Sequence, residues 1–423
     1  MDNQSTMWEK TRVFQIVIII TVALGMGFML GSQYSISQAQ SGISLSAEAE
    51  QAFEPLFQTF NLIEENYVDE VVMSDLVDGA ITGMMDTLDV HSGYVTPEFA
   101  PFVDSRLAGE IEGIGATIIE IEETGEVEVL NVLDDTPAQR SGIRAGDVFV
   151  TVNGEEVIGL STLEVASRVR GPVGTTVDIT MRRNEELVDF TIERARIELT
   201  AVSSEMLDGN IGYVSLTSFS ANAREQIDAA LNELGVENLN GLVFDLRNNG
   251  GGFLDTGLEI ASLFIEDGDL LRERFGTGEE RVFSVRDGVV YQGFEDGSER
   301  AYTNDAGFAN VTVPIVLLVN ENSASASELV AGAWLETGAA TLIGTQTFGK
   351  GTVQQVIELV NNGTVRLTIA RWYTPSGESI HGEGITPDII VEIPEDVELA
   401  EGEDPQLEEA IRYLEGLSIS TMD

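Results

Sequence analysis

The feature that most constrains this chain is an apolar segment near its start, Val13–Leu30, which has 18 residues and no charge. A helix needs about 20 residues to cross the hydrocarbon of a bilayer, so residues 13–32 are long enough. Lys10 and Arg12 directly precede the segment. This favours a cytoplasmic N-terminus, residues 1–12, followed by a chain that continues outside the cytoplasm. We therefore predict a single-pass membrane anchor.

A cleaved signal peptide is the alternative interpretation of this segment, and a buried core helix is a weaker one. A signal peptide commonly ends in an A-x-A triplet, and no such triplet follows Leu30. The nearest candidate, around Ala39, has Ser37 in place of the first alanine. Both main interpretations place the bulk of the chain outside the cytoplasm, in the periplasm or at the cell exterior.

Composition excludes several kinds of chemistry. The chain has 423 residues, enough for two or three domains, and 22 basic against 72 acidic side chains give a net charge of −50. Such a surface repels phosphate backbones, so we exclude nucleic acid as a partner. The absence of cysteine excludes disulfides, thiolate catalysis and cysteine-bound zinc. Lys10 and Lys350 are the only lysines, and His91 and His381 the only histidines.

Two amphipathic helices are predicted after the apolar segment, within a helical region over residues 47–107. Apolar residues recur at helical spacing over Glu48–Tyr67 and again over Ser74–Leu88. Their apolar faces are packing surfaces, and they could also join copies of the chain into a homo-oligomer.

A small β-rich domain is predicted over residues 108–196. Short β-rich runs alternate there with turn signals, including Asn153-Gly154, which is typical of a hairpin. The segment resembles a PDZ domain through Gly113-Ile114-Gly115-Ala116, Pro137-Ala138, Ser141-Gly142-Ile143, Ala145-Gly146-Asp147 and Val152-Asn153-Gly154. The resemblance implies capture of a peptide C-terminus as an added strand, with its carboxylate on the backbone N–H groups of Gly113, Ile114, Gly115 and Ala116.

Strands and helices alternate over residues 197–395, which predicts a layered α/β domain. Strands are expected at Ile211–Leu216, Leu242–Leu246, Pro314–Val319 and Thr341–Gly344, and helices at Ala221–Leu234, Leu254–Phe264 and Ser325–Thr337. A hairpin joins Val353–Leu359 to Val365–Ala370 across an Asn-Asn-Gly turn. Residues 267–310 are expected to form an excursion or cap. The acidic segment 396–423 includes a closing helix over Gln406–Leu414.

The first candidate for chemistry is the segment Ser323-Ala324-Ser325-Ala326-Ser327-Glu328, between an apolar strand and a helix. A serine at this turn is exposed, and the N–H after it lacks a partner in the helix, so it could bind an oxyanion. However, Ser325-x-x-Glu328 is also a capping-box pattern. Taken alone, the segment favours a helix cap over a nucleophile.

The second candidate is Gly349-Lys350-Gly351, which holds the only lysine beyond the apolar segment. A buried lysine can release its proton near neutral pH, whereas arginine stays protonated. Lys350 lies 25 residues after Ser325, and one helix, one strand and a turn would bring the chain back beside its start. Gln354 follows four residues later, on the same face if the chain is extended, and its amide could hold the amine. The alternative is a solvated lysine with no role in catalysis.

Other catalytic arrangements find little support in the sequence. A Ser-His-Asp triad would need His91 or His381, and both are readily explained as packed or surface residues. No histidine and carboxylate spacing indicates a metal site. We therefore predict no cofactor and no metal.

Taken together, these segments resemble the carboxyl-terminal processing proteases, which are serine peptidases with a Ser/Lys pair and an embedded PDZ domain. The resemblance rests on Leu88-Asp89-Val90-His91-Ser92, Gly113–Ala116, Asp245-Leu246-Arg247-Asn248-Asn249-Gly250-Gly251-Gly252, Ser323–Glu328, Thr347-Phe348-Gly349-Lys350-Gly351-Thr352-Val353-Gln354 and Gly384-Ile385-Thr386-Pro387-Asp388. It implies a crotonase-like protease core in an α+β multidomain chain.

The resemblance also implies a role for each site residue. Ser325 would be the nucleophile, Lys350 the general base and Gln354 its orienter. The oxyanion hole would combine the Ala326 N–H with one from the loop that holds Gly250 and Gly251.

The expected function is that of a membrane-tethered endopeptidase outside the cytoplasm, which cleaves proteins that have exposed, apolar C-termini. Its mechanism would pass through an acyl-enzyme. Two other classes stay open: a PDZ scaffold whose protease part is silent, and a Ser/Lys amidase that acts on cell-wall peptides.

Overall fold

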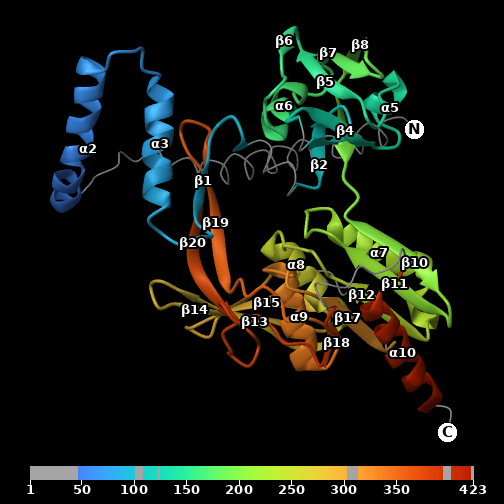
Figure 1. Ribbon diagram of the computed structural model, residues 1–423. Coiled ribbons are helices and arrows are strands. Elements are labelled where there is room, and N and C mark those ends of the chain that lie inside the picture. Colours follow the sequence, from blue (N-terminus) through green and yellow to red (C-terminus); the bar gives the residue numbers. More distant parts are fainter. Residues whose placement is uncertain (1–45, 101–107, 122–123, 303–312, 394–401, 421–423) are drawn as a thin grey trace, which may run out of the picture. The chain divides into compact units, whose positions relative to one another are not determined.

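The computed structural model describes residues 46–100, 108–121, 124–302, 313–393 and 402–420 (Figure 1). The chain divides into two compact units, Met1–Gly83 and Met84–Asp423. The predicted anchor over residues 13–32 lies outside the described residues. Among the helices that the structure describes, none combines the length and the apolar character that a membrane crossing requires.

The first unit contains helix α2 (Ala47–Asn66) and most of α3 (Met73–Met85), close to the two predicted helices. The Ser46 side chain caps α2 by accepting the Ala49 N–H at 3.2 Å. None of the residues of α2 is buried. Its apolar side chains include Phe57, which is 59% exposed.

The PDZ region has a core beneath a curved antiparallel sheet. The sheet runs in the order β3-β4-β5-β7-β8, with β6 paired to β5. Helices α5 and α6 accompany it, and a separate ribbon pairs β2 with β9. Phe149, Ile179 and Val165 are among the buried core residues. The bounds are β2 (Glu110–Gly113), β3 (Ala116–Glu120), β4 (Val127–Val132), α5 (Pro137–Ser141), β5 (Val148–Val152), β6 (Glu155–Glu156), α6 (Thr162–Val169), β7 (Thr176–Arg183), β8 (Glu186–Glu193) and β9 (Ala195–Glu198).

The main sheet of the α/β region is parallel except at one edge. Its order is β10-β11-β12-β17-β18-β21, and only the β10–β11 pair is antiparallel. The strands are β10 (Val202–Leu207), β11 (Ile211–Leu216), β12 (Gly241–Asp245), β17 (Ile315–Val319), β18 (Thr341–Gly344) and β21 (Ile389–Ile390). Every residue of β12 and β17 is buried. Such continuous apolar runs are typical of parallel strands covered on both faces.

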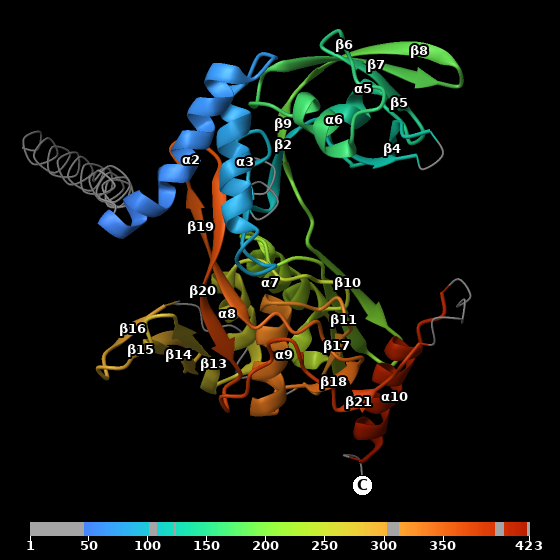
Figure 2. The same ribbon diagram turned by 60° about the vertical axis from the view of Figure 1, so that its left-hand side comes forward.

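Helices cover this sheet on both faces (Figures 1 and 2). Leu242, Phe244 and Leu317 pack against α7 (Ala223–Leu234), α8 (Leu254–Ala261) and α9 (Ala326–Thr337). The alternate residues Val243, Val316 and Leu318 pack against α10 (Pro405–Ser420). Short 3₁₀ turns follow α7 and α8, at Val236–Asn238 and Ser262–Phe264.

A second sheet, in which every strand pair is antiparallel, contains the predicted hairpin and the predicted excursion. Its path is β1-β20-β13-β14-β15-β16, and β19 pairs with β20. The strands are β1 (Gly93–Val95), β13 (Asp267–Phe275), β14 (Glu280–Arg286), β15 (Val289–Phe294), β16 (Glu299–Ala301), β19 (Thr352–Glu358) and β20 (Thr364–Tyr373). The long β19–β20 hairpin, orange to red in Figure 2, bends away from the main sheet. Strand β1 was not predicted, because three residues carry no periodic signal.

Candidate active site

Three loops form the candidate site, and they leave the carboxyl ends of three neighbouring parallel strands. They follow β12, β17 and β18, as expected for a site at the carboxyl edge of an α/β sheet. They bring Ser325 and Lys350 together with Gln354 of strand β19 around a cleft of about 320 Å³. Its walls include the glycines 250–252 and the apolar side chains of Phe253, Leu254, Leu329, Val353, Val356 and Trp372.

Ser325 occupies a backbone conformation that a helix cap does not need. Its φ is 58° and its ψ is −113°, whereas an N-cap residue ordinarily lies in the extended region. Such a conformation is costly for a residue other than glycine and points to a functional turn. The neighbouring Ser323 and Ser327 are buried, and their hydroxyls donate to the Leu246 and Asn249 carbonyls at 2.8 and 2.7 Å.

Glu328 ties the serine loop to the lysine loop. Its buried carboxylate accepts the N–H of Ser325 and the N–H of Lys350, each at 2.8 Å. It also accepts the Thr347 hydroxyl at 2.7 Å and the Gly349 N–H at 2.6 Å. Burial raises the pKa of Glu328, although these hydrogen bonds act to lower it. One carboxylate thus fixes the backbone on both sides of the cleft.

The Lys350 amine lies in surroundings that favour its neutral form. Burial lowers the pKa of Lys350 from its ordinary value, and the positive charge of Arg366 lowers it further. The carboxylates of Glu328 and Asp89 act in the opposite direction. The backbone of Lys350 is also held, because its carbonyl accepts the Trp372 indole N–H at 3.0 Å.

Gln354 lies in the same cleft, although not through simple strand alternation. Strand β19 begins at Thr352, and its register against β20 shifts between Val353 and Gln354. Strand alternation therefore does not account for the position of Gln354, because Lys350 precedes the strand and the register shifts before Gln354. The Gln354 amide nitrogen donates to the hydroxyls of Thr352 and Thr368 at 2.8 and 3.2 Å.

Asp89 continues this chain of hydrogen bonds from the segment before β1. The Thr368 hydroxyl donates to Asp89 at 3.1 Å, and the carboxylate also accepts the Ser92 hydroxyl at 3.0 Å. Burial acts to raise the pKa of Asp89, but these bonds and those from the His91 and Ser92 N–H groups lower it overall. Because the carboxylate only accepts, the Thr368 hydroxyl points toward it and accepts from the Gln354 amide.

The loop that follows β12 lies against the serine turn. A Cβ on Gly251 would come within 2.8 Å of the Ala324 carbonyl oxygen and of Ser325 Cβ, and the φ of Gly251 is +99°. The Gly251 N–H, one of the predicted oxyanion donors, instead donates to Asn249 Oδ1 at 2.9 Å. Ala326 is the first residue of α9, so its N–H has no acceptor one turn earlier in the helix.

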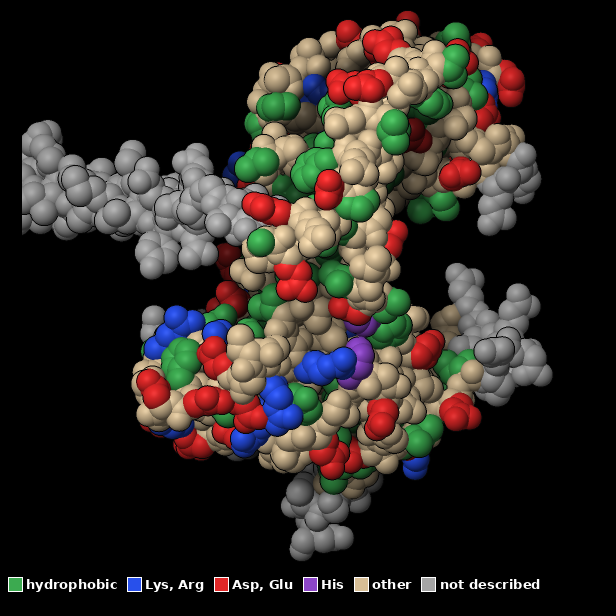
Figure 3. All heavy atoms as spheres, turned by 90° about the vertical axis from the view of Figure 1, so that its left-hand side faces the viewer, with side chains coloured by type: hydrophobic (Ala, Val, Ile, Leu, Met, Phe, Trp, Pro, Cys, Tyr) green, Lys and Arg blue, Asp and Glu red, His purple; other side chains and the backbone are tan. Residues whose placement is uncertain are grey.

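The two histidines lie beside the lysine, although the sequence places His91 far from it. Their rings are 6.2 Å apart in an edge-to-face arrangement, and they are the purple side chains in Figure 3. Burial and then the charge of Lys350 lower the pKa of His91. Among the described residues, His381 Nδ1 is a buried atom that has no hydrogen-bond partner.

The PDZ region has a cleft of its own, of about 560 Å³, between β3 and α6. The predicted loop Gly113–Ala116 lines it, together with Phe149, Leu163 and Val169. The Ile114 and Gly115 carbonyls accept the Ala138 and Leu133 N–H groups at 2.7 and 3.0 Å. Strand β3 ends the order of its sheet, so its outer edge is available to an added strand.

Comparisons with known proteins agree with this architecture. Peptidase family S41 matches residues 210–391, the PDZ domain family matches residues 113–193, and the activating protease CtpB N-terminal domain matches residues 22–98. The carboxy-terminal processing protease CtpA of Bacillus subtilis (strain 168) is 33% identical over 395 residues, which cover 92% of this chain and 79% of that protein. The chain belongs to the carboxy-terminal processing proteases.

Further relatives of this protease extend the comparison. The carboxy-terminal-processing protease of Bartonella bacilliformis (strain ATCC 35685 / KC583 / Herrer 020/F12,63) is 36% identical over 343 residues, covering 79% of this chain and 74% of that one. The solved photosystem II D1 C-terminal processing protease is 28% identical, with a TM-score of 0.43, and the match covers 79% of this chain and 86% of that one. The family matches and the identities with the curated relatives confirm the resemblance inferred from the motifs, and the protein is a serine-type protease with a PDZ domain.

For several residues that line the protease's cleft or bond to its loops, no role was predicted. Thr352, Thr368 and Arg366 lie on the β19–β20 hairpin, which the sequence indicated only as a strand pair. Glu328 was interpreted only as part of a capping box, so its bonds to the lysine loop were missed. One signal was available for Asp89, Glu328 and Thr352, since each lies in a motif that carries the family resemblance.

Proposed function

We propose that the protease cleaves by a Ser/Lys mechanism in which Ser325 is the nucleophile and Lys350 the general base. The observation that carries this proposal is the pair itself. The only lysine beyond residue 10 lies in one cleft with a strained serine, and burial lowers its pKa. A neutral amine accepts the serine proton, whereas a cation does not.

In the first step, Ser325 Oγ attacks the scissile carbonyl carbon and its proton passes to Lys350 Nζ. The amine then gives this proton to the leaving amide nitrogen as the C–N bond breaks, which leaves an acyl-enzyme. Water next attacks the ester carbon, Lys350 takes its proton, and the proton returns to Ser325 as the ester bond breaks. The carbonyl oxygen of Gln354 is left to accept from the amine, since its NH₂ group donates to two threonines.

The oxyanion that forms in each step requires donors in fixed positions. We assign this role to the Ala326 N–H and to a second N–H from Gly250 or Gly252. The Gly251 N–H donates to Asn249, and we therefore give Gly251 a different role. Its lack of a side chain lets the loop approach Ser325.

The PDZ cleft is proposed to bind the substrate's C-terminus beside β3, with the carboxylate on the Gly113–Ala116 loop and an apolar last side chain in the cleft. The apolar lining supports this preference. The test uses one protein substrate with a disordered apolar tail, in acid and C-terminally amidated forms. Slower cleavage of the amide is expected, with the fragments mapped for both. Equal rates would exclude carboxylate recognition while leaving the peptidase activity established.

We further propose that the protease is tethered to a membrane through residues 13–32 and acts outside the cytoplasm. The uncharged segment and its flanking Lys10 and Arg12 support this topology. Fractionation of cells, followed by protease treatment of intact and broken spheroplasts, tests it. Recovery in the soluble cytoplasmic fraction would refute the tether.

The exposed apolar side chains of α2, among them Phe57 and Leu62, support assembly of the protease into a homo-oligomer. Phe57→Glu would place a charge on this surface. A smaller particle in light scattering is expected for the variant than for the parent chain, and an unchanged mass would rule out this face as the contact.

A further inference from the structure

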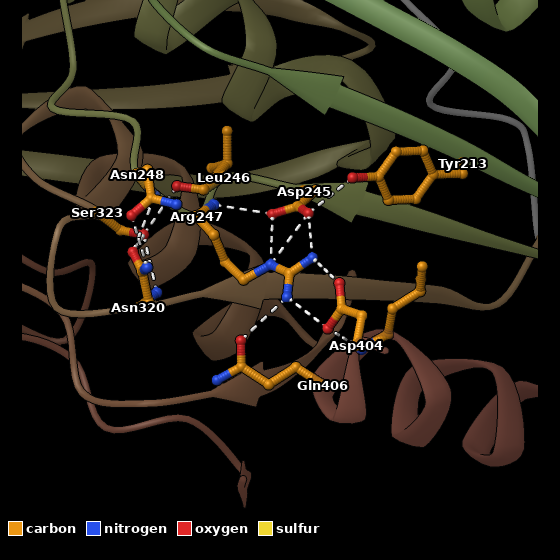
Figure 4. A network of polar contacts seen from close by, with 10 residues as sticks. Tyr213, Asp245, Leu246, Arg247, Asn248, Asn320, Ser323, Asp404 and Gln406 are labelled. Carbon is orange, nitrogen blue, oxygen red and sulfur yellow. Dashed lines mark hydrogen bonds and ion pairs between the residues drawn. The ribbon is translucent and has the colours of Figure 1, made fainter. Parts of the chain in front are cut away.

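Arg247 is the last residue before the loop of asparagines and glycines that lies against Ser325, and every nitrogen of its guanidinium is engaged (Figure 4). Its Nε and Nη2 donate to Asp245, at 3.0 and 2.6 Å. Its Nη1 and Nη2 donate to the two carboxylate oxygens of Asp404, at 2.8 and 2.7 Å. Nη1 also donates to Gln406 at 3.1 Å. These bonds use all five N–H donors that an arginine has.

The side chains of this network are largely shielded from water. The exposed fractions are 14% for Arg247, 6% for Asp245 and 31% for Asp404. Asp245 is held further by the Tyr213 hydroxyl at 2.8 Å, and burial together with the Asp245 charge raises the pKa of Tyr213 to about 12. A planar guanidinium between two carboxylates has a defined orientation, because each bidentate contact fixes its plane.

Asp404 directly precedes the C-terminal helix α10 and is its N-cap. Its Oδ1 accepts the Leu407 N–H at 3.0 Å and its carbonyl accepts the Glu408 N–H at 2.9 Å, as an N-cap does. Helix α10 is itself anchored, because Ala410 and Leu414 pack against the main sheet. The S41 match ends at residue 391, so this clamp on Arg247 comes from outside the matched core.

On its other side, Arg247 is continuous with the loop that carries the candidate oxyanion donors. Asn248 has a φ of +58°, and its N–H donates to Asn320 Oδ1 at 2.9 Å. The Asn320 amide donates back to Asn248 Oδ1 at 2.9 Å. The Asn249 carbonyl accepts the Ala324 N–H at 3.0 Å, one residue before Ser325. The loop and the serine turn are therefore fixed to each other.

We propose that Arg247 and Asp404 are positioning residues, through which the docked C-terminal helix holds the oxyanion loop against Ser325. Neither residue lines the cleft, so both act through the backbone of residues 248–252. This inference rests on the proposed Ser/Lys peptidase. It adds that the oxyanion hole has its full strength only while α10 is docked and Asp404 is charged.

Asp404→Asn is the test, because asparagine is an equally good N-cap and the helix should still begin there. The amide keeps one acceptor oxygen and turns an NH₂ group toward the guanidinium, so the bidentate contact is lost. The matched control is Glu409→Gln, which removes the carboxylate of the ion pair between Arg412 and Glu409 on the same helix. Both partners of that pair lie on α10 itself, three positions apart, and their side chains are 75% exposed for Arg412 and 20% exposed for Glu409.

Both variants are compared with the full chain for kcat and KM on the tailed protein substrate, and for inhibition by a peptide aldehyde. For Asp404→Asn, kcat should fall about tenfold with KM nearly unchanged, because the donors lost to the oxyanion act mainly in the transition state. Aldehyde affinity should weaken by a similar factor, since its adduct places an oxyanion in the same position. Asp404→Glu should recover part of kcat, and Glu409→Gln should match the parent.

Hydrogen exchange of the amides of residues 246–252 measures how firmly Asp404 and Arg247 hold the oxyanion loop, independently of cleavage. It should accelerate in Asp404→Asn and not in Glu409→Gln. A parental kcat and unchanged exchange in Asp404→Asn would overturn the proposal, and so would equal losses in both variants. A parent chain that binds the aldehyde but cuts no substrate would instead refute the proposed function, and loop exchange would still decide the coupling.

Discussion

Two helices of this protease begin with the same motif, Ser-x-x-Glu, and the two serines differ in backbone conformation. At α6, Ser161 has an ordinary extended conformation, φ −64° and ψ 159°, and its hydroxyl accepts the Glu164 N–H. At α9, Ser325 has φ 58° and ψ −113°. In both, the glutamate accepts the N–H of the serine, at 2.9 Å for Glu164 and 2.8 Å for Glu328. The motif and this shared bond alone therefore do not predict the backbone conformation of the serine.

The surroundings of the two glutamates explain the difference. Glu164 is bound within its own turn, and hydrogen bonds from the Ser161 hydroxyl and N–H lower its pKa. Glu328 is fully buried, and burial raises its pKa. It reaches across 22 residues to the Lys350 N–H. At α9 the carboxylate of the motif also holds a second loop, and its serine lies in a strained turn.

The largest expected effect is that of Ser325→Ala. If Ser325 is the nucleophile, kcat should fall by at least about 10⁴-fold, as for other serine peptidases that lose this residue. The melting temperature should change little, because the Glu328 bond uses backbone N–H and survives. Proteolysis of the tailed substrate and thermal unfolding measure the two effects. Full activity in Ser325→Ala, with loss in Ser323→Ala or Ser327→Ala, would move the nucleophile to a neighbouring serine.

Lys350→Arg should be nearly as inactive as Lys350→Ala, with a loss of about 10²–10⁴-fold for removal of a general base. Arginine keeps the charge and the reach, but it does not release its proton in a protein. Lys10→Arg, at the only other lysine, is the matched control and should keep full activity. Substantial activity in Lys350→Arg would exclude Lys350 as the base, and His381 would be mutated next.

The same lysine sets the expected pH dependence. Activity should rise with pH through the lowered pKa of Lys350, and Gln354→Glu should shift the profile to higher pH, because an added negative charge raises that pKa. The free energy of unfolding should also increase with pH in this range. Between the lowered pKa and the ordinary value of 10.5, the unfolded chain binds more protons than the folded one, so the folded state gains stability as pH rises. Lys350→Met should lose this slope in denaturant titrations.

Glu328→Gln should have an intermediate effect and lower both activity and stability. Each carboxylate oxygen accepts two donors, and the amide would turn its own NH₂ group toward one of these pairs. We expect a loss of about 1–3 kcal/mol in unfolding free energy for the unsatisfied donors, and about a tenfold loss of kcat from the displaced loops. Glu164→Gln, the same change in the other motif, should leave kcat unchanged. Equal effects of both changes on kcat would remove the distinction between the two motifs.

Much of the fold followed from local patterns, because helices and strands of the core have periodic or continuous apolar runs. The sequence placed α7, α8, α9 and the β19–β20 hairpin within a few residues of their observed bounds. The trio of Ser325, Lys350 and Gln354 was predicted from rare residue types and motif order, and the structure brings these residues to one cleft. Their roles stay predictions.

What could not be predicted depends on contacts between distant segments. The bond from Thr368 to Asp89 spans 279 residues, and that from Arg247 to Asp404 spans 157; single polar residues carry no periodic signal of such partners. The φ of Ser325 results from the loops packed around it and not from its own propensity. The bond from the Gly251 N–H to the Asn249 side chain likewise has no signal in the sequence, and the oxyanion role of Gly251 stays a prediction.

The smallest expected effect is that of Ser161→Ala, which tests whether the motif at α6 acts only as a helix cap. Ser161 is the N-cap of α6, which begins at Thr162, and Val165 and Val169 of this helix pack in the domain core. Loss of the cap should therefore lower the unfolding free energy of the PDZ domain by about 0.5–2 kcal/mol. The kcat for a protein substrate should not change. Ser161→Asp should restore stability, because aspartate is an equally good cap, whereas Ser325→Asp should restore no activity at the other motif. If Ser161→Ala left denaturant unfolding unchanged, or if it abolished proteolysis, the two motifs would not differ in the way that their backbone conformations indicate.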